Sequence, residues 1–281
     1  MKFTNYSVFS SDFKHYGLDF AIEHTVKMGL DSVEHIENSR LDSQSCKLKS
    51  VADARNMRRA LDENGLGVTC YSLSAELYRD NVDESIEKIF RHIEYAAIIG
   101  SPFVHHTLTS GFTKDPVMLT SIEMAQAVAG RAEIVAKRCN EYGMVCLYEP
   151  QGWYINGVQG VGAVLGEMRA RGCNVGVCGD TGNSIFADCM PTEIFSAFKN
   201  DIRHIHVKDR IYGAEAEAYN ESRGGKKIAM ARFGEGNIGV TEALGLIPDY
   251  DGALSLEFED SDDEIIRTVC ELKRIFNRQI G

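Results

Sequence analysis

The sequence predicts an α/β protein, a (β/α)8 TIM barrel in which eight parallel strands form a closed sheet with helices outside it. Two observations favour this fold class. Short strand-like runs alternate with longer helical runs along the whole chain, which is typical of a parallel sheet covered by helices. The 281 residues and 44% hydrophobic content also suit one barrel, because such barrels typically contain about 250 residues in a single domain. We therefore expect a single domain over residues 1–281.

Eight segments have the length and apolar pattern of buried strands. They are Lys2–Phe9, Ser32–Ile36, Gly67–Leu73, Pro102–Thr107, Met144–Glu149, Asn174–Asp180, Arg203–Lys208 and Ala253–Glu257. Helical segments lie between them, and Thr120-Ser-Ile-Glu123 matches the capping box that starts a helix. The rival fold, a doubly wound open sheet, usually has a glycine-rich loop after the first strand. Residues 9–13 read Phe-Ser-Ser-Asp-Phe instead, which favours the closed barrel.

One long segment does not follow this alternation. Residues Asp209–Gly239 are polar and contain glycines, and we expect them to form an irregular loop. Loops of this length in a compact domain are usually functional or disordered. Because the segment follows the seventh strand, it would lie on the face of a barrel that carries the active site.

Charge and composition argue against several function classes. The formal net charge of −11 argues against binding to nucleic acid or to anionic membranes. The sequence has no run of about 18 apolar residues, so we expect no membrane span. The eight cysteines are scattered, and none forms a Cys-x-x-Cys pair. Free thiols are typical of a reducing compartment, and residues 1–13 lack the apolar run of a signal peptide, so a cytoplasmic protein is expected.

Polar side chains end four consecutive predicted strands, the fifth to the eighth. They are Glu149, Asp180, His206 and Glu257. The carboxyl ends of the strands form the catalytic face of a barrel, and side-chain alternation directs these residues toward its axis. Each residue alone is more often a solvated strand end or a hydrogen-bonded core residue than a ligand. Four of them at the same depth are much harder to explain by chance.

These four side chains offer three carboxylates and one imidazole. Three converging carboxylates would repel one another and raise one another's pKa, and a cation would relieve that repulsion. Carboxylate-rich sites suit Mn²⁺, Mg²⁺ or Co²⁺, with Zn²⁺ as an alternative. The sequence therefore predicts one divalent metal ion, with Mn²⁺ the first choice, held by Glu149, Asp180, His206 and Glu257.

Five short motifs follow one another in the C-terminal half. They are Tyr148-Glu-Pro150, Gly179-Asp-Thr-Gly-Asn183, His204-Ile-His-Val-Lys-Asp209, Phe233-Gly-Glu-Gly-Asn237 and Gly252-Ala-Leu-Ser-Leu-Glu257. With these motifs in this order, the sequence resembles the xylose isomerase-like TIM barrel superfamily, in its sugar phosphate isomerase/epimerase branch. The resemblance implies a metal-dependent isomerase or epimerase of a small sugar or related polyhydroxy carbonyl compound, with the same four metal ligands.

The resemblance also implies roles for two glutamates. In ketose epimerases of this family, two glutamates act as acid–base groups on opposite faces of the substrate, and here they would be Glu149 and Glu257. One carboxylate would remove the proton beside a metal-bound carbonyl to give an enediolate, and the other would return a proton. By analogy with the family, we expect a small-molecule sugar as the partner and a homodimer or homotetramer as the assembly.

Further residues are expected to contact the substrate. Asn183 stands where the family often has a histidine, and an amide can hydrogen-bond a hydroxyl but is a poor zinc ligand. Trp153 either walls a sugar pocket or packs in a surface loop, and His106 is preferred over His105 as the histidine that enters the barrel. The expected substrate-binding residues are His106, Trp153, Asn183, Lys208 and Arg232, of which the lysine and the arginine could hold a phosphate.

Three other functions stay open. The same site could dehydrate a keto-inositol-like compound, because that reaction also begins with proton abstraction beside a metal-bound carbonyl. An abasic-site nuclease of the endonuclease IV type would need more histidine ligands and a basic groove, so Asn183 and the acidic charge argue against it. A barrel that only binds sugars would have no need of both Glu149 and Glu257.

Overall fold

Eight parallel strands form a closed barrel in the order β1-β11-β7-β6-β5-β4-β3-β2, which confirms the predicted fold class. The strands are β1 (Lys2–Asn5), β2 (Ser32–Glu37), β3 (Gly67–Leu73), β4 (Phe103–His106), β5 (Val145–Tyr148), β6 (Val175–Asp180), β7 (Ile202–Val207) and β11 (Ala253–Leu256). The computed structural model describes residues 2–5, 18–37, 47–79, 81–109, 111, 119–213, 215–216, 220–257 and 262–277. Residues 6–9, the end of the first predicted strand, lie outside these ranges.

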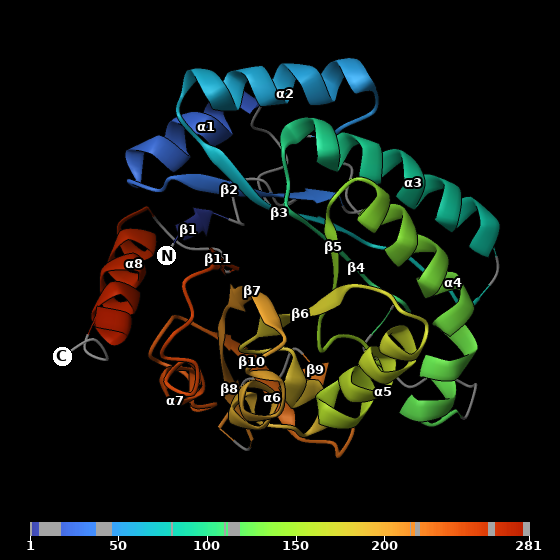
Figure 1. Cartoon of the computed structure of the whole chain (residues 1–281). Coiled ribbons are helices and arrows are strands. Elements are labelled where there is room, and N and C mark those ends of the chain that lie inside the picture. Colours follow the sequence, from blue (N-terminus) through green and yellow to red (C-terminus); the bar gives the residue numbers. More distant parts are fainter. Residues whose placement is uncertain are drawn as a thin grey trace.

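Helices follow the strands in chain order and surround the sheet (Figure 1). They are α1 (Leu18–Lys27), α2 (Val51–Glu63), α3 (Val82–Ile99), α4 (Ser121–Glu141), α5 (Gly157–Ala170), α6 (Pro191–Phe198), α7 (Val240–Leu244) and α8 (Asp262–Asn277), with a short 3₁₀ helix η2 (Ser184–Ala187) after β6. The capping box predicted at Thr120 is present, since its side chain accepts from the Glu123 backbone and Glu123 accepts in return. Within the described ranges, none of the helices combines the length and the apolar character that crossing a membrane requires.

Side-chain alternation separates two apolar layers. On β11, Leu254 and Leu256 are fully buried in the large core that also contains apolar residues of the helices. A second, smaller cluster consists of Cys70 on β3, Leu147 on β5 and Cys178 on β6. Leu147 and Cys178 stand two residues before Glu149 and Asp180, so they share the inward face of those residues. These apolar side chains therefore occupy part of the barrel interior.

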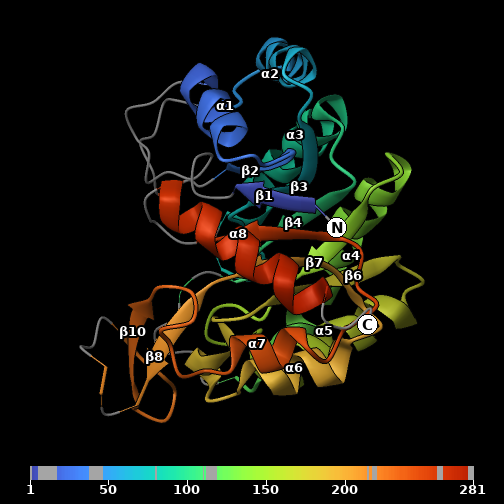
Figure 2. The same cartoon turned by 90° about the vertical axis from the view of Figure 1, so that its left-hand side faces the viewer.

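The segment Asp209–Gly239 is not the irregular loop that its polar composition predicted. It folds into a three-stranded antiparallel sheet in the order β8-β10-β9, built from β8 (Asp209–Tyr212), β9 (Asn220–Glu221) and β10 (Lys227–Ala231). Ile228 and Ala229 are buried, and these two adjacent apolar residues are too short a run to predict a strand from the sequence. The small sheet projects from the barrel at the lower left of Figure 2.

One acidic residue makes several of the contacts between the small sheet and the barrel. Asp188, just after η2, accepts hydrogen bonds from the Tyr212 hydroxyl (2.7 Å), the Ser222 hydroxyl (2.5 Å) and the Gly224 backbone N–H (2.7 Å). Its φ of 55° lies in the left-handed region, which aspartate and asparagine tolerate better than most residues. The chain after β6 is thereby tied to the insertion that follows β7.

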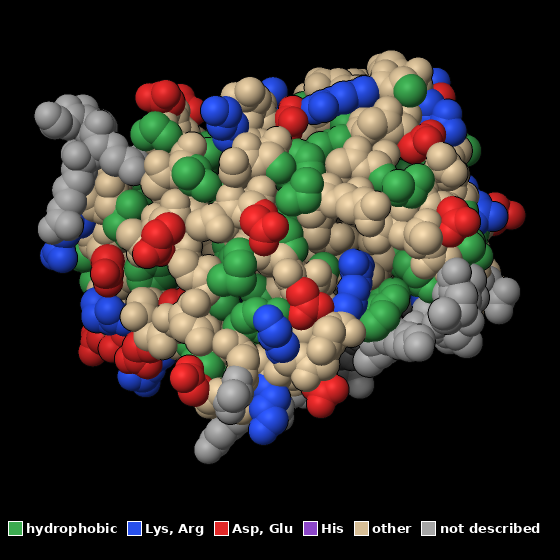
Figure 3. Space-filling model, turned by 90° about the horizontal axis from the view of Figure 1, so that it is seen from below, with side chains coloured by type: hydrophobic (Ala, Val, Ile, Leu, Met, Phe, Trp, Pro, Cys, Tyr) green, Lys and Arg blue, Asp and Glu red, His purple; other side chains and the backbone are tan. Residues whose placement is uncertain are grey.

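Charges of both signs are mixed on the surface that Figure 3 presents. Described acidic and basic side chains are interspersed there with apolar ones, and they form no continuous basic area on that face. This distribution accords with the acidic net charge of the chain.

Candidate metal centre

Four side chains at the carboxyl ends of neighbouring strands converge on one point. Glu149 follows β5, Asp180 ends β6, His206 lies on β7 and Glu257 follows β11, and one ligand atom from each lies within 4.8 Å of the others. His206 Nδ1 is 2.7 Å from Glu149 Oε1, 3.3 Å from Glu257 Oε2 and 3.8 Å from Asp180 Oδ2. We call these residues the four-residue cluster. It contains all four ligands that the sequence predicts.

The order of the strands determines how the cluster is arranged. In the closed sheet, β6 and β7 lie between β5 and β11. The two glutamates, Glu149 and Glu257, therefore flank Asp180 and His206 from opposite sides. Glu149 is buried, whereas the Glu257 side chain keeps 25% of its surface exposed. One glutamate thus faces the interior and the other faces the barrel mouth.

Burial and charge act differently on the two buried carboxyl groups. Burial and the nearby charge of Asp180 raise the pKa of Glu149 from 4.5 to about 8. Burial also acts to raise the pKa of Asp180, but the Lys208 ammonium and hydrogen bonds outweigh it and hold that pKa below its ordinary value. The pair thus combines one protonated carboxyl and one carboxylate near neutral pH, when no cation is bound.

The arrangement of oxygens fits a divalent cation. Asp180 Oδ1 accepts the backbone N–H groups of Gly182 (2.7 Å) and Asn183 (2.5 Å), which leaves Oδ2 facing the cluster. Asp180 Oδ2 and Glu257 Oε2 are buried oxygens without a hydrogen bond of good geometry, and both lie beside the Lys208 ammonium, at 3.0 Å and 2.6 Å. Buried charged oxygens of this kind are costly unless a cation is near. Three carboxylates with one imidazole could hold such an ion.

Lys208 supplies positive charge directly beside the cluster. Its Nζ lies 2.6 Å from Glu257 Oε2 and 3.0 Å from Asp180 Oδ2, and it donates to Asn183 Oδ1 at 3.3 Å. A Cβ on Gly182 would come within 2.5 Å of Lys208 Cγ, so only glycine lets the lysine chain pass. The structure therefore brings Lys208 and Asn183, two of the expected substrate-binding residues, to the cluster.

Of the two adjacent histidines on β4, it is His105 that faces the cluster. Its Nε2 lies 3.5 Å from Glu149 Oε2, and its ring meets the His206 ring edge-on with centroids 5.6 Å apart. His106, which the sequence analysis preferred, is buried on the other side of the strand, with its ring edge-on to Tyr148 at 5.6 Å. Residues at adjacent strand positions point to opposite faces, and the sequence alone does not determine which of the two histidines points inward.

Two other expected substrate-binding residues lie away from these contacts. Trp153 is half-buried, and the Arg223 guanidinium lies over its ring at 5.6 Å. Arg232 is exposed, just after β10. Their predicted roles in substrate binding stay predictions. A small cavity adjoins the cluster and is lined by His105, His106, Thr107, Leu108, Thr109, Tyr148, Glu149, Gln151 and Ile155.

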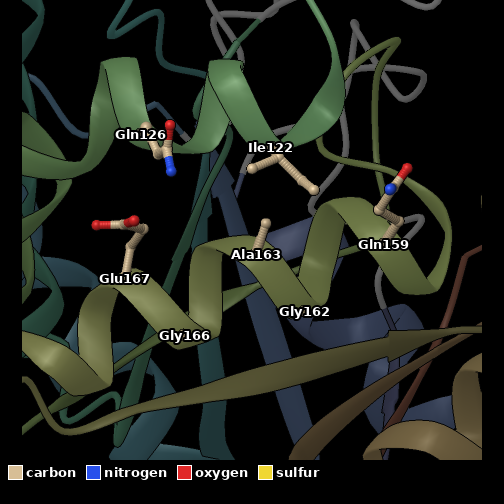
Figure 4. Close-up of a pocket in the computed structure, with 7 residues that line it drawn as sticks. All are labelled: Ile122, Gln126, Gln159, Gly162, Ala163, Gly166 and Glu167. Carbon is tan, nitrogen blue, oxygen red and sulfur yellow. The ribbon is translucent and has the colours of Figure 1, made fainter.

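A wider groove lies elsewhere, between the outer helices α4 and α5. Figure 4 shows its lining residues, which are Ile122, Gln126, Gln159, Gly162, Ala163, Gly166 and Glu167. Its volume is about 280 Å³. None of its lining residues belongs to the four-residue cluster, so the groove is separate from the candidate metal centre.

Below the four-residue cluster lies a set of buried polar residues to which the sequence analysis assigned no role. Glu34 on β2 is fully buried and contacts the side chains of Ser72, His204 and Ser255 as well as His206. We call Glu34, Ser72, His204 and Ser255 the Glu34 cluster. The inward parity of these residues in their predicted strands is a signal that the sequence carries for them.

The comparison with protein families identifies the class of protein. Residues 22–275 match the model of the xylose isomerase-like TIM barrel family, and the chain belongs to this family. A search of curated proteins finds no match.

Solved structures share the fold at low sequence identity. A D-tagatose 3-epimerase-like protein is 17% identical, with a TM-score of 0.74 and complete coverage (100%) of both chains. The probable 3-DHS dehydratase AsbF of Bacillus anthracis is 16% identical, with a TM-score of 0.73 over 97% of this chain and 99% of that one. The IOLI protein with a bound zinc atom is 15% identical, with a TM-score of 0.73 over 99% of each chain. At these identities the likeness establishes the fold.

Proposed function

We propose that this protein is a single-domain, divalent-metal-dependent isomerase or epimerase that acts on a small sugar or related polyhydroxy carbonyl compound. Glu149, Asp180, His206 and Glu257 would hold the metal ion, and Glu149 and Glu257 would also transfer protons. The observation that carries the proposal is the placement of these two glutamates on opposite sides of Asp180 and His206. A solved structure of similar fold belongs to a D-tagatose 3-epimerase-like protein, which supports this class of reaction.

The proposed mechanism assigns each glutamate to one face of the substrate. The metal ion would polarise the substrate carbonyl and so acidify the neighbouring C–H bond. Glu257, at the barrel mouth, takes or returns the proton on one face, and Glu149 does so on the other. Lys208 and Asn183 would orient substrate oxygens by hydrogen bonds.

A dehydratase is the second candidate, and the position of Lys208 favours it. Elimination of water needs a proton donor for the departing hydroxyl group in addition to the base that removes the proton. The Lys208 ammonium lies 2.6 Å from Glu257, so a base and a donor stand side by side. The similar fold of a probable 3-DHS dehydratase agrees with this alternative.

One experiment distinguishes the two reactions. Protein reconstituted with Mn²⁺ is incubated in D₂O with a panel of ketoses and cyclic polyhydroxy ketones, and the products are followed by NMR. An isomerase or epimerase incorporates deuterium beside the carbonyl and produces a new sugar. The mass of that sugar differs from the substrate mass only by the deuterium taken up. A dehydratase gives a product lighter by one water with a new ultraviolet absorbance. Absence of exchange and of product across the panel, with metal bound, would contradict both candidates.

A further inference from the structure

Glu34 is a fully buried carboxylate that is surrounded by hydrogen-bond donors. Its Oε1 accepts from the Ser72 hydroxyl at 2.5 Å and lies 3.0 Å from His206 Nε2. Its Oε2 lies 2.7 Å from His204 Nε2 and accepts from the Ser255 hydroxyl. Four donors from three other strands thus converge on one side chain of β2. Hydrogen bonds to a carboxylate are stronger than those between neutral groups, so this set is rigid.

These contacts fix the orientation of the His206 ring. An ionised carboxylate can only accept hydrogen bonds, so the His206 nitrogen that faces Glu34, Nε2, must carry the proton. The hydroxyl groups of Ser72 and Ser255 donate to the two oxygens of Glu34, as they would to a carboxylate. In a neutral imidazole the remaining lone pair is then on Nδ1. That nitrogen faces Glu149 and Glu257 in the four-residue cluster.

We propose that Glu34 is a positioning residue that sets which nitrogen of His206 binds the metal and holds the ring in place, an inference that rests on the proposed metal-dependent function. Glu34 reaches the metal position only through His206. Carboxylates that accept the free N–H of a metal-binding histidine fix its tautomer and raise its basicity, and their loss typically weakens metal binding about 10–100-fold.

The neighbouring residues limit what else Glu34 can do. Glu34, His204 and His206 could themselves hold a metal ion, since their ligand atoms lie within 4.8 Å of one another. However, the hydroxyl groups of Ser72 and Ser255 already donate to the two oxygens of Glu34. The Glu34 cluster therefore serves as a hydrogen-bonded support under a single metal ion, and titration should find one ion per chain.

The matched control for this residue lies on the same strand. Glu37 is also buried, but its parity is opposite, and it lies 3.6 Å from Lys47 Nζ and 3.9 Å from His35 Nε2. Glu34→Gln and Glu37→Gln make the same chemical change three residues apart. Only the first replaces the carboxylate that faces the His206 N–H by a neutral amide, which keeps a single acceptor oxygen.

The test titrates Co²⁺ into metal-free wild type, Glu34→Gln and Glu37→Gln, and follows the visible absorbance of bound cobalt. We expect Glu34→Gln to weaken binding about 10–100-fold and to alter the spectrum, while Glu37→Gln stays within about threefold of wild type. Equal effects of the two variants, or two ions bound per wild-type chain, would overturn the inference. Wild type that binds no Co²⁺ contradicts the proposed function itself, so the two failures are distinguishable.

A second measurement needs no Glu34 variant and so does not depend on its folding. Histidine-labelled, zinc-loaded wild type is examined by long-range ¹H–¹⁵N NMR, with His206 assigned by the loss of its signals in His206→Gln. The inference requires a protonated Nε2 and a metal-bound Nδ1. A ring with the proton on Nδ1 and the metal on Nε2 would overturn it.

Discussion

The Lys208 ammonium nitrogen lies 2.6 Å from Glu257 Oε2 and so contacts a carboxylate of the four-residue cluster directly. The same nitrogen lies 3.0 Å from Asp180 Oδ2. Burial acts to lower the pKa of Lys208, but Asp180 and Glu257 outweigh it and raise that pKa, so the lysine stays charged. A divalent ion at the same carboxylates would take over part of this charge compensation.

We expect Lys208→Met to destabilise the metal-free protein more than the metal-loaded protein. Removing one partner of a buried ion pair typically costs about 3–5 kcal/mol, because the remaining charge is left uncompensated. With metal bound, the cation compensates Asp180 and Glu257, so the loss should be smaller. Urea unfolding with and without Mn²⁺ measures both values. Equal losses in the two states would show that Lys208 does not share the carboxylates with a cation.

The raised pKa of Glu149 predicts that metal affinity depends on pH. Its pKa rises from 4.5 to about 8, so the metal-free folded protein favours the protonated form. The stability that this proton contributes to the metal-free fold is fully present below about pH 4.5 and is lost progressively as the pH rises toward about 8. Metal binding must displace this proton, so affinity should increase by up to about tenfold per pH unit below about pH 8 and then level off. Calorimetric titrations at several pH values test this, and Glu149→Gln should remove the part of the dependence that this proton contributes, while the part from His206, whose pKa burial acts to lower but the nearby acidic groups raise, remains.

The two glutamates should be distinguishable by isotope exchange. We expect Glu149→Gln and Glu257→Gln each to lower the turnover by about 10²–10⁴-fold, because each loses one proton-transfer group. Each variant should still exchange the proton of one epimer with D₂O, and the epimer should differ between the variants. If one variant lost all exchange while the other still exchanged both epimers, a single glutamate would transfer both protons.

Asp188 should control the mobility of the small sheet without affecting the barrel. We expect Asp188→Ala to speed amide hydrogen exchange in residues 209–231, because three donors lose their acceptor. Asp188→Asn should have a smaller effect, since asparagine keeps an acceptor oxygen and tolerates the positive φ. Exchange in β3 and β5 should not change. Unchanged exchange throughout the small sheet would show that other contacts hold it.

The sequence predicted the fold and the four-residue cluster because both follow from local patterns. Strand length, helix starts and the polar residue at each strand end can be read along the chain, and parallel strands bring those ends together. The strand Gly67–Leu73 was predicted with the bounds that the structure shows. The other seven predicted strands coincide with barrel strands, with ends that differ by at most one residue where the structure describes them.

The remaining features depend on contacts between distant parts of the chain. Glu34 meets His204 and His206 across 170 and 172 residues, and no local pattern indicates such a contact. The choice between His105 and His106 depends on the parity of β4, which only the closed sheet determines. The small sheet combines pairing between segments of the insertion itself with contacts to Asp188, which lies outside residues 209–239.

The most direct test of the metal centre is elemental analysis of wild type, His206→Ala and the control His92→Ala, purified in parallel without chelator. His92 is a buried histidine of α3 whose Nδ1 lies 2.7 Å from the Tyr71 hydroxyl, outside the four-residue cluster. The account predicts about one divalent ion per chain in wild type and in His92→Ala, and its loss in His206→Ala. Wild type without metal, even after reconstitution with Mn²⁺, Co²⁺, Mg²⁺ and Zn²⁺, would contradict it.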